Sequence, residues 1–280
     1  MQIITTINEM KALSDSFRKK NERIAFVPTM GNLHPGHIQL VERAETLAPK
    51  TIVSIFVNPL QFGANEDFDA YPRTLEHDRY LLELANVDAL FTPARNEIYP
   101  DKNSNKEVIE FPGLSDILCG ASRPGHFSGV AVVVKHLFET VQPDIAIFGE
   151  KDYQQVLVIK KLVAEYDLPV EIITIPTQRE SDGLAMSSRN GYLSEQERQV
   201  APLLYKTLCQ ARDQLRTKAV HFSEIEQQAN EVLTKAGFKP DYFSIRHSGD
   251  LSEPAEDEKQ LVILVAAYLG KTRLIDNILI

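Results

Sequence analysis

Cysteine is scarce in this chain, and the features that would mark a secreted or membrane protein are weak. The 280 residues include two cysteines, Cys119 and Cys209, which lie far apart and have no Cys or His partner at metal-ligand spacing. A disulfide framework and a structural zinc site are therefore not expected. The longest apolar run, residues 261–269, is about half the ~18 residues that a membrane helix needs. Because the N-terminus also lacks the basic start and apolar core of a secretion signal, we predict a cytoplasmic protein with reduced, mostly buried thiols.

Three common signatures are missing as well. The full P-loop pattern Gly-x-x-x-x-Gly-Lys-Ser/Thr does not occur, no Gly-x-Gly-x-x-Gly follows an expected strand, and no serine lies in a Gly-x-Ser-x-Gly turn. A nicotinamide cofactor and a hydrolase nucleophile therefore have no support. The chain has 30 Lys and Arg against 39 Asp and Glu, a formal net charge of −9. Because nucleic acids and anionic membranes attract positive surfaces, we expect neither as a partner, although a local basic pocket is compatible with this charge.

Short apolar runs alternate with amphipathic stretches in the first two-thirds of the chain. The apolar runs predict strands at residues 23–28, 51–57, 89–91, 145–148 and 170–175. Helical spacing of apolar residues predicts helices at residues 36–48, 73–85, 128–141 and 153–166. Strands that alternate with helices favour right-handed crossovers, so we predict an α/β fold: a Rossmann-like parallel sheet with helices on both faces. Such sheets bind ligands at the carboxyl ends of their strands.

The pattern changes after residue 175, where two expected helices are followed by three expected strands. The helices cover residues 194–216 and 222–236, and the strands cover 242–246, 261–268 and 272–279. This order predicts a smaller α+β domain. We therefore predict a Rossmann-like ligand-binding domain over residues 1–175 and a C-terminal domain over residues 176–280. The polar stretch 101–106 is expected to form a solvated loop.

The segment 29–37, Thr-Met-Gly-Asn-Leu-His-Pro-Gly-His, is the first candidate for chemistry. It follows an apolar strand and opens a helix, whose first turn has unpaired N–H groups that attract phosphate. Gly31 and Gly36 allow a ligand to approach the backbone. His34 and His37 are three residues apart, so both face the same side of the helix and can hydrogen-bond to phosphate oxygens. The alternatives are a capping turn with two surface histidines, and a zinc site that lacks further ligands.

The segment 148–155 is a second junction between a strand and a helix. Lys151 has the charge to stabilise a phosphoryl group, and Asp152 can accept hydrogen bonds from ribose hydroxyls. Gln154 and Gln155 can both donate and accept, which suits a hydroxylated substrate. The alternative interpretation is a charged first helical turn without a ligand.

Two further polar segments fall near the same expected edge of the sheet. Residues 183–190 combine small residues, two hydroxyls and Arg189, which suits a mobile anion clamp, although the same residues also make an ordinary linker. Residues 56–62 end the second strand with Asn58 and Gln61 at its carboxyl end.

Together these segments resemble the pantoate–β-alanine ligase (pantothenate synthetase) family of the HIGH-motif nucleotidyltransferase-like superfamily. The matching motifs occur in order over residues 24–192, at 28–37, 53–62, 71–74, 123–127, 148–155 and 186–190. The resemblance implies an ATP-dependent ligase that condenses (R)-pantoate with β-alanine and releases AMP and pyrophosphate. It further implies a pantoyl-adenylate intermediate, a homodimer, and Mg²⁺ carried mainly on the ATP phosphates.

The resemblance also implies which residues form the site. His37, His34, Lys151 and Arg189 would be catalytic, with His37 as a proton donor, and Gln61 and Gln155 would bind pantoate. No protein ligand for a metal is assigned. The residues expected to contact ATP are Met30, Gly31, Asn32, Leu33, His34, Pro35, Gly36, His37, Gly149, Glu150, Lys151, Asp152, Gln178, Met186, Ser187, Ser188 and Arg189.

Some positions depart from the family pattern or lack a role. Gln178 stands where an apolar residue is common near the adenine. Asp78 is interpreted as a carboxylate on a helix surface, and Arg123 and His126 match the family without an assigned function. Two other functions stay open: another HIGH-type enzyme that transfers an adenylyl group, and a non-catalytic sensor of adenine nucleotides.

Overall fold

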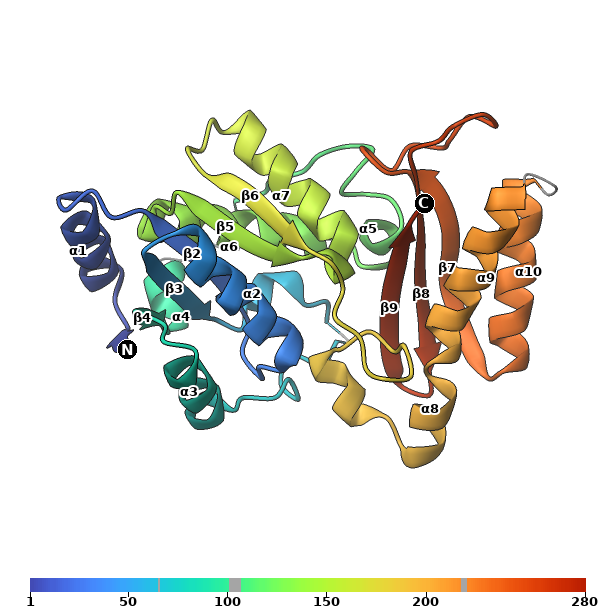
Figure 1. Cartoon of the computed structure of the whole chain (residues 1–280), viewed down its shortest axis with the longest axis horizontal. Helices are drawn as coiled ribbons and strands as arrows, with labels where there is room; N and C mark the ends of the chain where they lie inside the picture. Colours follow the sequence, from blue (N-terminus) through green and yellow to red (C-terminus); the bar gives the residue numbers. More distant parts are fainter. Residues whose placement is uncertain (65, 101–106, 218–220) are drawn as a thin grey trace.

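Two sheets of different kinds organise the protein. A computed structural model describes residues 1–64, 66–100, 107–217 and 221–280 (Figure 1). A six-stranded parallel sheet has the order β1-β4-β3-β2-β5-β6, and a three-stranded antiparallel sheet has the order β7-β8-β9. The large sheet consists of β1 (Gln2–Ile4), β2 (Ile24–Thr29), β3 (Lys50–Ile55), β4 (Ala89–Phe91), β5 (Ile145–Gly149) and β6 (Glu171–Ile175). The α/β prediction is confirmed; the stretch 101–106, predicted to be a loop, lies outside the described residues.

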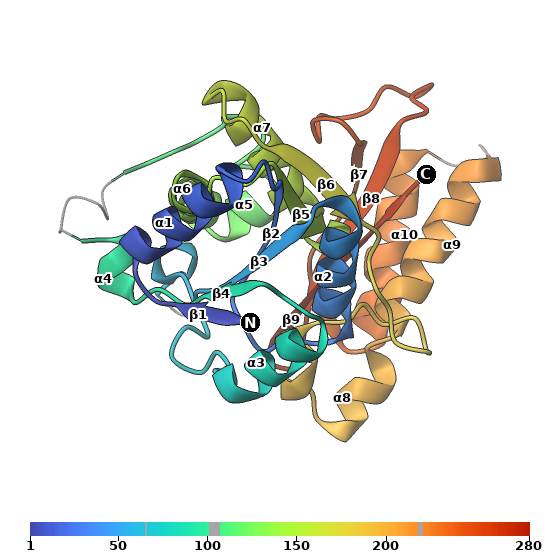
Figure 2. The same ribbon diagram turned by 60° about the vertical axis from the view of Figure 1, so that its left-hand side comes forward.

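Helices cover both faces of the large sheet (Figure 2). One face packs against α1 (Ile7–Arg18), α6 (His126–Val141) and α7 (Tyr153–Glu165), and the other packs against α2 (Pro35–Leu47) and α3 (Leu75–Leu84). Successive side chains of a strand point to opposite faces. Phe26 accordingly lies in the first apolar cluster, and its neighbour Val27 lies in the second.

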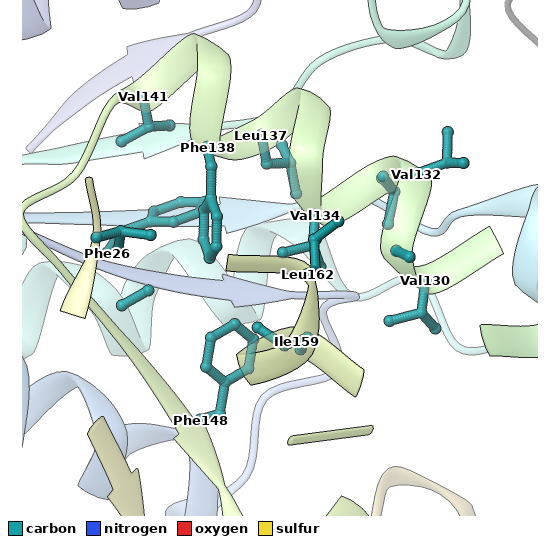
Figure 3. Close-up of a cluster of buried hydrophobic side chains, with 14 of the residues drawn as sticks. Phe26, Val130, Val132, Val134, Leu137, Phe138, Val141, Phe148, Ile159 and Leu162 are labelled. Atoms are coloured by element: carbon teal, nitrogen blue, oxygen red, sulfur yellow. The ribbon is translucent and has the colours of Figure 1, made fainter. Parts of the chain in front are cut away.

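The first apolar cluster is built around aromatic contacts (Figure 3). Phe138 of α6 lies edge-to-face between the strand residues Phe26 and Phe148, with ring centroids 6.3 and 6.5 Å apart. Ile159 and Leu162 of α7 are fully buried in the same cluster. The continuous apolar character of the central strands reflects this burial on both faces.

The first strand and helix were not predicted from the apolar pattern. β1 pairs in parallel with β4 at the edge of the sheet. A capping box begins α1: the Thr6 hydroxyl accepts from the backbone N–H of Glu9, and the Glu9 carboxylate accepts from the N–H of Thr6. This Thr-x-x-Glu spacing was a readable signal for the start of a helix.

The C-terminal part has its own apolar cluster. One predicted helix is in fact two: α8 (Glu195–Val200) ends before Pro202, and α9 (Leu203–Thr217) begins after it. The ring of Pro202 and its missing N–H disfavour a continuous helix. The remaining elements match the prediction with shifted ends, namely α10 (Phe222–Lys235), β7 (Phe238–His247), β8 (Leu261–Leu269) and β9 (Thr272–Leu279). The proposed boundary near residue 176 stays a prediction.

Short elements complete the fold between the strands. They are η1 (Pro59–Gln61), α4 (Arg95–Ile98), α5 (Cys119–Ser122), η3 (Glu150–Asp152) and η4 (Ser188–Tyr192). Cys119 is buried and Cys209 is half-buried, and both are free thiols. Within the described ranges, no helix has both the length and the apolar character to cross a membrane.

Candidate active site

A cavity of about 520 Å³ lies at the carboxyl ends of β2 and β5 and extends to β9 of the small sheet. It brings together most of the residues that the sequence singled out. These are Met30, His34, Gly36, His37, Gln61, Gly149, Lys151, Asp152, Gln155, Gln178, Met186, Ser187, Ser188 and Arg189. Segments separated by more than 100 residues in the sequence therefore face one volume, as a parallel sheet arranges them.

Five residues expected at the nucleotide do not line this cavity. Leu33 is buried in the apolar cluster beneath α2, and Pro35 is the first residue of that helix. The Glu150 carboxylate accepts a hydrogen bond from the Thr174 hydroxyl at 2.7 Å. Gly31 and Asn32 form the turn that precedes α2, so their contribution is to the path of the backbone.

The two histidines are neutral at pH 7. Burial, together with the nearby Lys151 charge, lowers the pKa of His34 to about 4. Burial, then His34 and Lys151, lower the pKa of His37 to about 3. The Nδ1 atom of His37 accepts from the backbone N–H of His34 at 3.3 Å, so the neutral His37 ring carries its proton on Nε2. The capping turn of the alternative interpretation is therefore present, but both side chains are half-buried and line the cavity.

One buried nitrogen in this pair is unsatisfied. Nδ1 of His34 has no hydrogen-bond partner in the part of the chain that the structure describes. Buried polar atoms are normally paired, so this atom fits a site that receives a polar ligand. Across the same described residues, no three His, Cys, Asp or Glu side chains come together as a metal site would require.

The turn that carries Lys151 is held by the small sheet. The Asn277 side-chain amide of β9 donates to the backbone carbonyls of Glu150 and Lys151, at 2.8 and 3.0 Å. Asn277 was not expected in the site, because its partners lie about 126 residues earlier in the sequence. The C-terminal sheet therefore fixes the backbone from which Lys151 and Asp152 extend.

Gln61 is positioned by a close contact between η1 and α6. The Asn58 amide donates to the Gly129 carbonyl at 3.0 Å and to Gln61 Oε1 at 3.2 Å. A Cβ atom at Gly129 would lie 2.2 Å from the Leu60 carbonyl oxygen, so only glycine allows this approach.

Gln154 and Gln155, which the sequence treated as equivalent, lie in different surroundings. Gln155 lines the cavity, whereas Gln154 is buried and hydrogen-bonded to the backbone of residues 114–119.

Two arginines of the cavity are each paired with an acidic residue. Arg189 donates to Asp67 from Nε at 3.0 Å and from Nη2 at 2.8 Å. Arg123 donates to Glu66 from Nε at 2.6 Å and from Nη2 at 2.5 Å. Burial alone would raise the pKa of Asp67 and Glu66, but the arginines hold both below their usual values. The guanidinium groups are thus held in fixed orientations facing the cavity.

Arg123 and His126, which had no assigned role, border Gln61 directly. Arg123 Nη2 lies 3.3 Å and His126 Nδ1 lies 2.8 Å from the Gln61 carbonyl oxygen. Arg123 Nη1 also lies 3.0 Å from His126 Nε2. Burial and the Arg123 charge lower the pKa of His126 to about 4, so this ring is neutral at pH 7.

The interpretation of Asp78 as a surface carboxylate is wrong. Its side chain is fully buried and accepts hydrogen bonds from the backbone N–H groups of Asn32 and Leu33. The apolar spacing placed it on a helix correctly, but nothing local in the sequence indicated these donors, which lie 45 and 46 residues away.

Known proteins resemble this chain along its whole length. The family model described as pantoate-beta-alanine ligase matches residues 2–279. A pantothenate synthetase of Idiomarina loihiensis is 53% identical over 278 residues, which cover 99% of this chain and 97% of that protein. A pantothenate synthetase of Marinobacter nauticus is 51% identical over 278 residues, with 99% of each chain covered.

Solved structures give the same result. The crystal structure of a pantothenate synthetase from Thermus thermophilus superposes with a TM-score of 0.91 at 43% identity and covers 99% of both chains. A pantoate-beta-alanine ligase from Francisella tularensis, solved in complex with beta-gamma ATP and beta-alanine, has a TM-score of 0.82 at 38% identity. That match covers 100% of this chain and 97% of the other.

Proposed function

The chain belongs to the pantoate-beta-alanine ligase family, and from that premise we propose how its own residues carry out the reaction. The enzyme condenses pantoate with β-alanine, with ATP as cosubstrate. A free carboxylate is a poor acyl donor, so we propose that the pantoate carboxylate first attacks the α-phosphorus of ATP and releases pyrophosphate. The amine of β-alanine then attacks the acyl carbon of pantoyl adenylate and expels AMP. The cavity supports this proposal because it joins Lys151, neutral histidines and two glutamines in one volume.

The nucleotide occupies the side of the cavity formed by β2, α2 and the turn after β5. His34 and His37 donate neutral N–H groups to phosphate oxygens, and the unsatisfied Nδ1 of His34 is consistent with that role. Lys151 stabilises the charge that develops on the α-phosphate. Arg189 binds the departing pyrophosphate, with its guanidinium oriented by Asp67.

The acyl substrate occupies the side formed by η1 and α7. Gln61 and Gln155 can each donate to and accept from the hydroxyl groups of pantoate. Asn58 fixes the Gln61 amide, so the site offers a rigid hydrogen-bonding partner. This arrangement favours a hydroxylated acid over a simple fatty acid, because an unmatched buried amide is costly.

Mg²⁺ fits this site as an ion carried on the ATP phosphates. Among the described residues that line the cavity, Glu66 and Asp67 are paired with arginines and Asp152 is not, so phosphate oxygens, water and at most this one carboxylate are the available hard ligands. When bound, the ion would neutralise phosphate charge. Lys151 and Arg189 face the same oxygens and would share that task.

Replacing Arg123 with alanine is expected to raise the KM for β-alanine at least about tenfold, because a charged hydrogen bond contributes ~1.5–3 kcal/mol. The carboxylate of β-alanine requires a cationic partner, and Arg123 lines the cavity beside Gln61. The measurement is steady-state kinetics with β-alanine varied at saturating ATP and pantoate. The KM for ATP should stay within about twofold. A raised KM for ATP with an unchanged KM for β-alanine would assign Arg123 to the nucleotide instead.

The experiment that tests the function is pyrophosphate release from Mg-ATP, with and without pantoate, before β-alanine is added. We expect pantoate-dependent release of about one equivalent per enzyme, which becomes continuous when β-alanine is supplied. ATP binding without pantoate-dependent release would instead favour another acid substrate or a nucleotide sensor. The homodimer and the cytoplasmic location stay predictions, which sedimentation and cell fractionation test.

A further inference from the structure

Asp78 is a buried carboxylate whose backbone partners lie in the turn that precedes α2. It lies in the first turns of α3 and is fully buried. Its Oδ2 accepts from the backbone N–H of Asn32 at 2.9 Å, and its Oδ1 accepts from that of Leu33 at 2.8 Å. The Thr74 hydroxyl lies 3.1 and 3.2 Å from the two oxygens and donates to them. The carboxylate is therefore held on one side by Thr74 and directed at two consecutive amides.

Those amides belong to a turn that the chain does not adopt readily. Gly31 has φ +82° and Asn32 has φ +51°, so two successive residues are left-handed. A left-handed residue with a side chain is unfavourable unless its surroundings hold it. A Cβ atom at Gly31 would lie 3.1 Å from Asp78 Oδ2, so the carboxylate packs directly against the turn that it holds.

The same turn contacts the second phosphate-binding segment. The Ser188 hydroxyl donates to the carbonyl oxygen of Asn32 at 3.1 Å. The Asn32 side-chain amide lies 3.5 Å from the Ser188 carbonyl, and its Oδ1 lies 3.5 Å from the Thr74 hydroxyl. A connected set of hydrogen bonds thus runs from Asp78 through Asn32 to the segment 186–189, which comes from the C-terminal part of the chain.

We propose that Asp78 is a positioning residue that fixes the two ATP-binding segments, 29–37 and 186–189, relative to each other before ATP binds. The inference rests on the proposed function, in which both segments contact the ATP phosphates. Asp78 does not line the cavity itself. It accepts from the N–H groups of Asn32 and Leu33 and so fixes the turn from which the Gly36 backbone and the imidazole of His34 reach the cavity.

The test is the variant Asp78→Asn, which keeps the shape but replaces one acceptor oxygen with an NH₂ group that opposes a backbone N–H. We expect the KM for ATP in pantoate-dependent pyrophosphate release to rise about tenfold or more, since hydrogen bonds to a charged acceptor are the strong ones. The KM for β-alanine should stay within about twofold. Amide hydrogen exchange at Asn32 and Leu33 should accelerate in the variant without ligand.

Asp88→Asn is the matched control. Its carboxylate also holds a backbone amide, accepting from Thr51 N–H of β3 at 2.9 Å and from Lys50 Nζ at 3.0 Å, but neither partner belongs to an ATP-binding segment. A purely stabilising role predicts that both variants lower the melting temperature and leave the KM for ATP unchanged. That result with Asp78→Asn would overturn the proposal.

A second variant decides the question if Asp78→Asn does not fold. Thr74→Val removes the hydroxyl that orients the carboxylate and is expected to raise the KM for ATP about two- to fivefold. An unchanged KM for ATP in folded Thr74→Val would overturn the proposal. Failure of the proposed function looks different, because the unmodified protein would then show no pantoate-dependent release at all.

Discussion

Replacing Lys151 with alanine is expected to slow pantoyl-adenylate formation about 10²- to 10³-fold, while the dissociation constant for ATP changes less than about fivefold. The reason is that negative charge increases on the α-phosphate in the transition state of this step. In the proposed site, an ammonium beside the α-phosphate gains interaction energy as the phosphorus is attacked, whereas ground-state ATP would also contact the histidines, Arg189 and the start of α2. Single-turnover pyrophosphate release with pantoate measures the first quantity, and calorimetric titration of ATP without pantoate measures the second.

Lys161→Ala is a suitable control for this prediction. Lys161 lies on α7, outside the cavity, and pairs with Glu165 at 2.8 Å on the surface. It should leave both quantities unchanged. Equal losses of rate and affinity in Lys151→Ala would show that Lys151 binds ATP in its ground state and contributes nothing specific to the transition state.

The parallel sheet was predictable from sequence because its central strands are buried on both faces. Residues 24–27 and 52–53 are continuous apolar runs, and helical spacing resumes between them. The edge strand β1 was missed because three residues at an edge carry little apolar signal, whereas helix α1 was missed although its Thr6-x-x-Glu9 capping box was readable. The break at Pro202 could have been predicted from the proline itself, because α8 contributes no buried residue and only α9 has an apolar face.

The residues proposed to contact substrates were predictable to a greater extent than the residues that hold them in place. His34, His37 and Lys151 sit at junctions between strand and helix, where local sequence indicates their position. Asn277 and Asp78 act through pairings across 45 to 127 residues, and no local pattern predicts such contacts. The same holds for Asp67, whose partner Arg189 lies 122 residues away. The pairing of polar groups that are distant in sequence is therefore the part of the site that could not be predicted without the structure.

Replacing His37 with glutamine is expected to lower kcat/KM for ATP about 100-fold at pH 7. The neutral His37 ring presents Nε2–H toward the cavity because its Nδ1 accepts from the His34 backbone. A glutamine side chain cannot accept the His34 N–H and also place a donor at the position of His37 Nε2. His77→Gln, at an exposed position on α3, is the control and should leave kcat/KM unchanged. A loss of less than about threefold would exclude His37 from the reaction's phosphate contacts.

The same variant should also change how stability depends on pH. The pKa of His37 is about 3 in the folded protein and about 6.5 in the unfolded chain. Between these values the unfolded state binds more protons, so the free energy of unfolding falls as the pH falls from 6.5 toward 3. The slope from one such group approaches about 1.4 kcal/mol per pH unit. Glutamine does not titrate, so His37→Gln should lose less stability than the unmodified protein between pH 7 and pH 5.

Denaturant unfolding at pH 7 and pH 5 measures this difference, and His77→Gln again provides the comparison. His77→Gln makes the same substitution at an exposed position of α3 and so shows what the exchange of side chains does by itself. An equal loss of stability in His37→Gln and the unmodified protein would mean that His37 is protonated in the folded state near pH 6. It would then enter the reaction as a charged acid, and the kinetic loss in His37→Gln would grow as the pH is lowered.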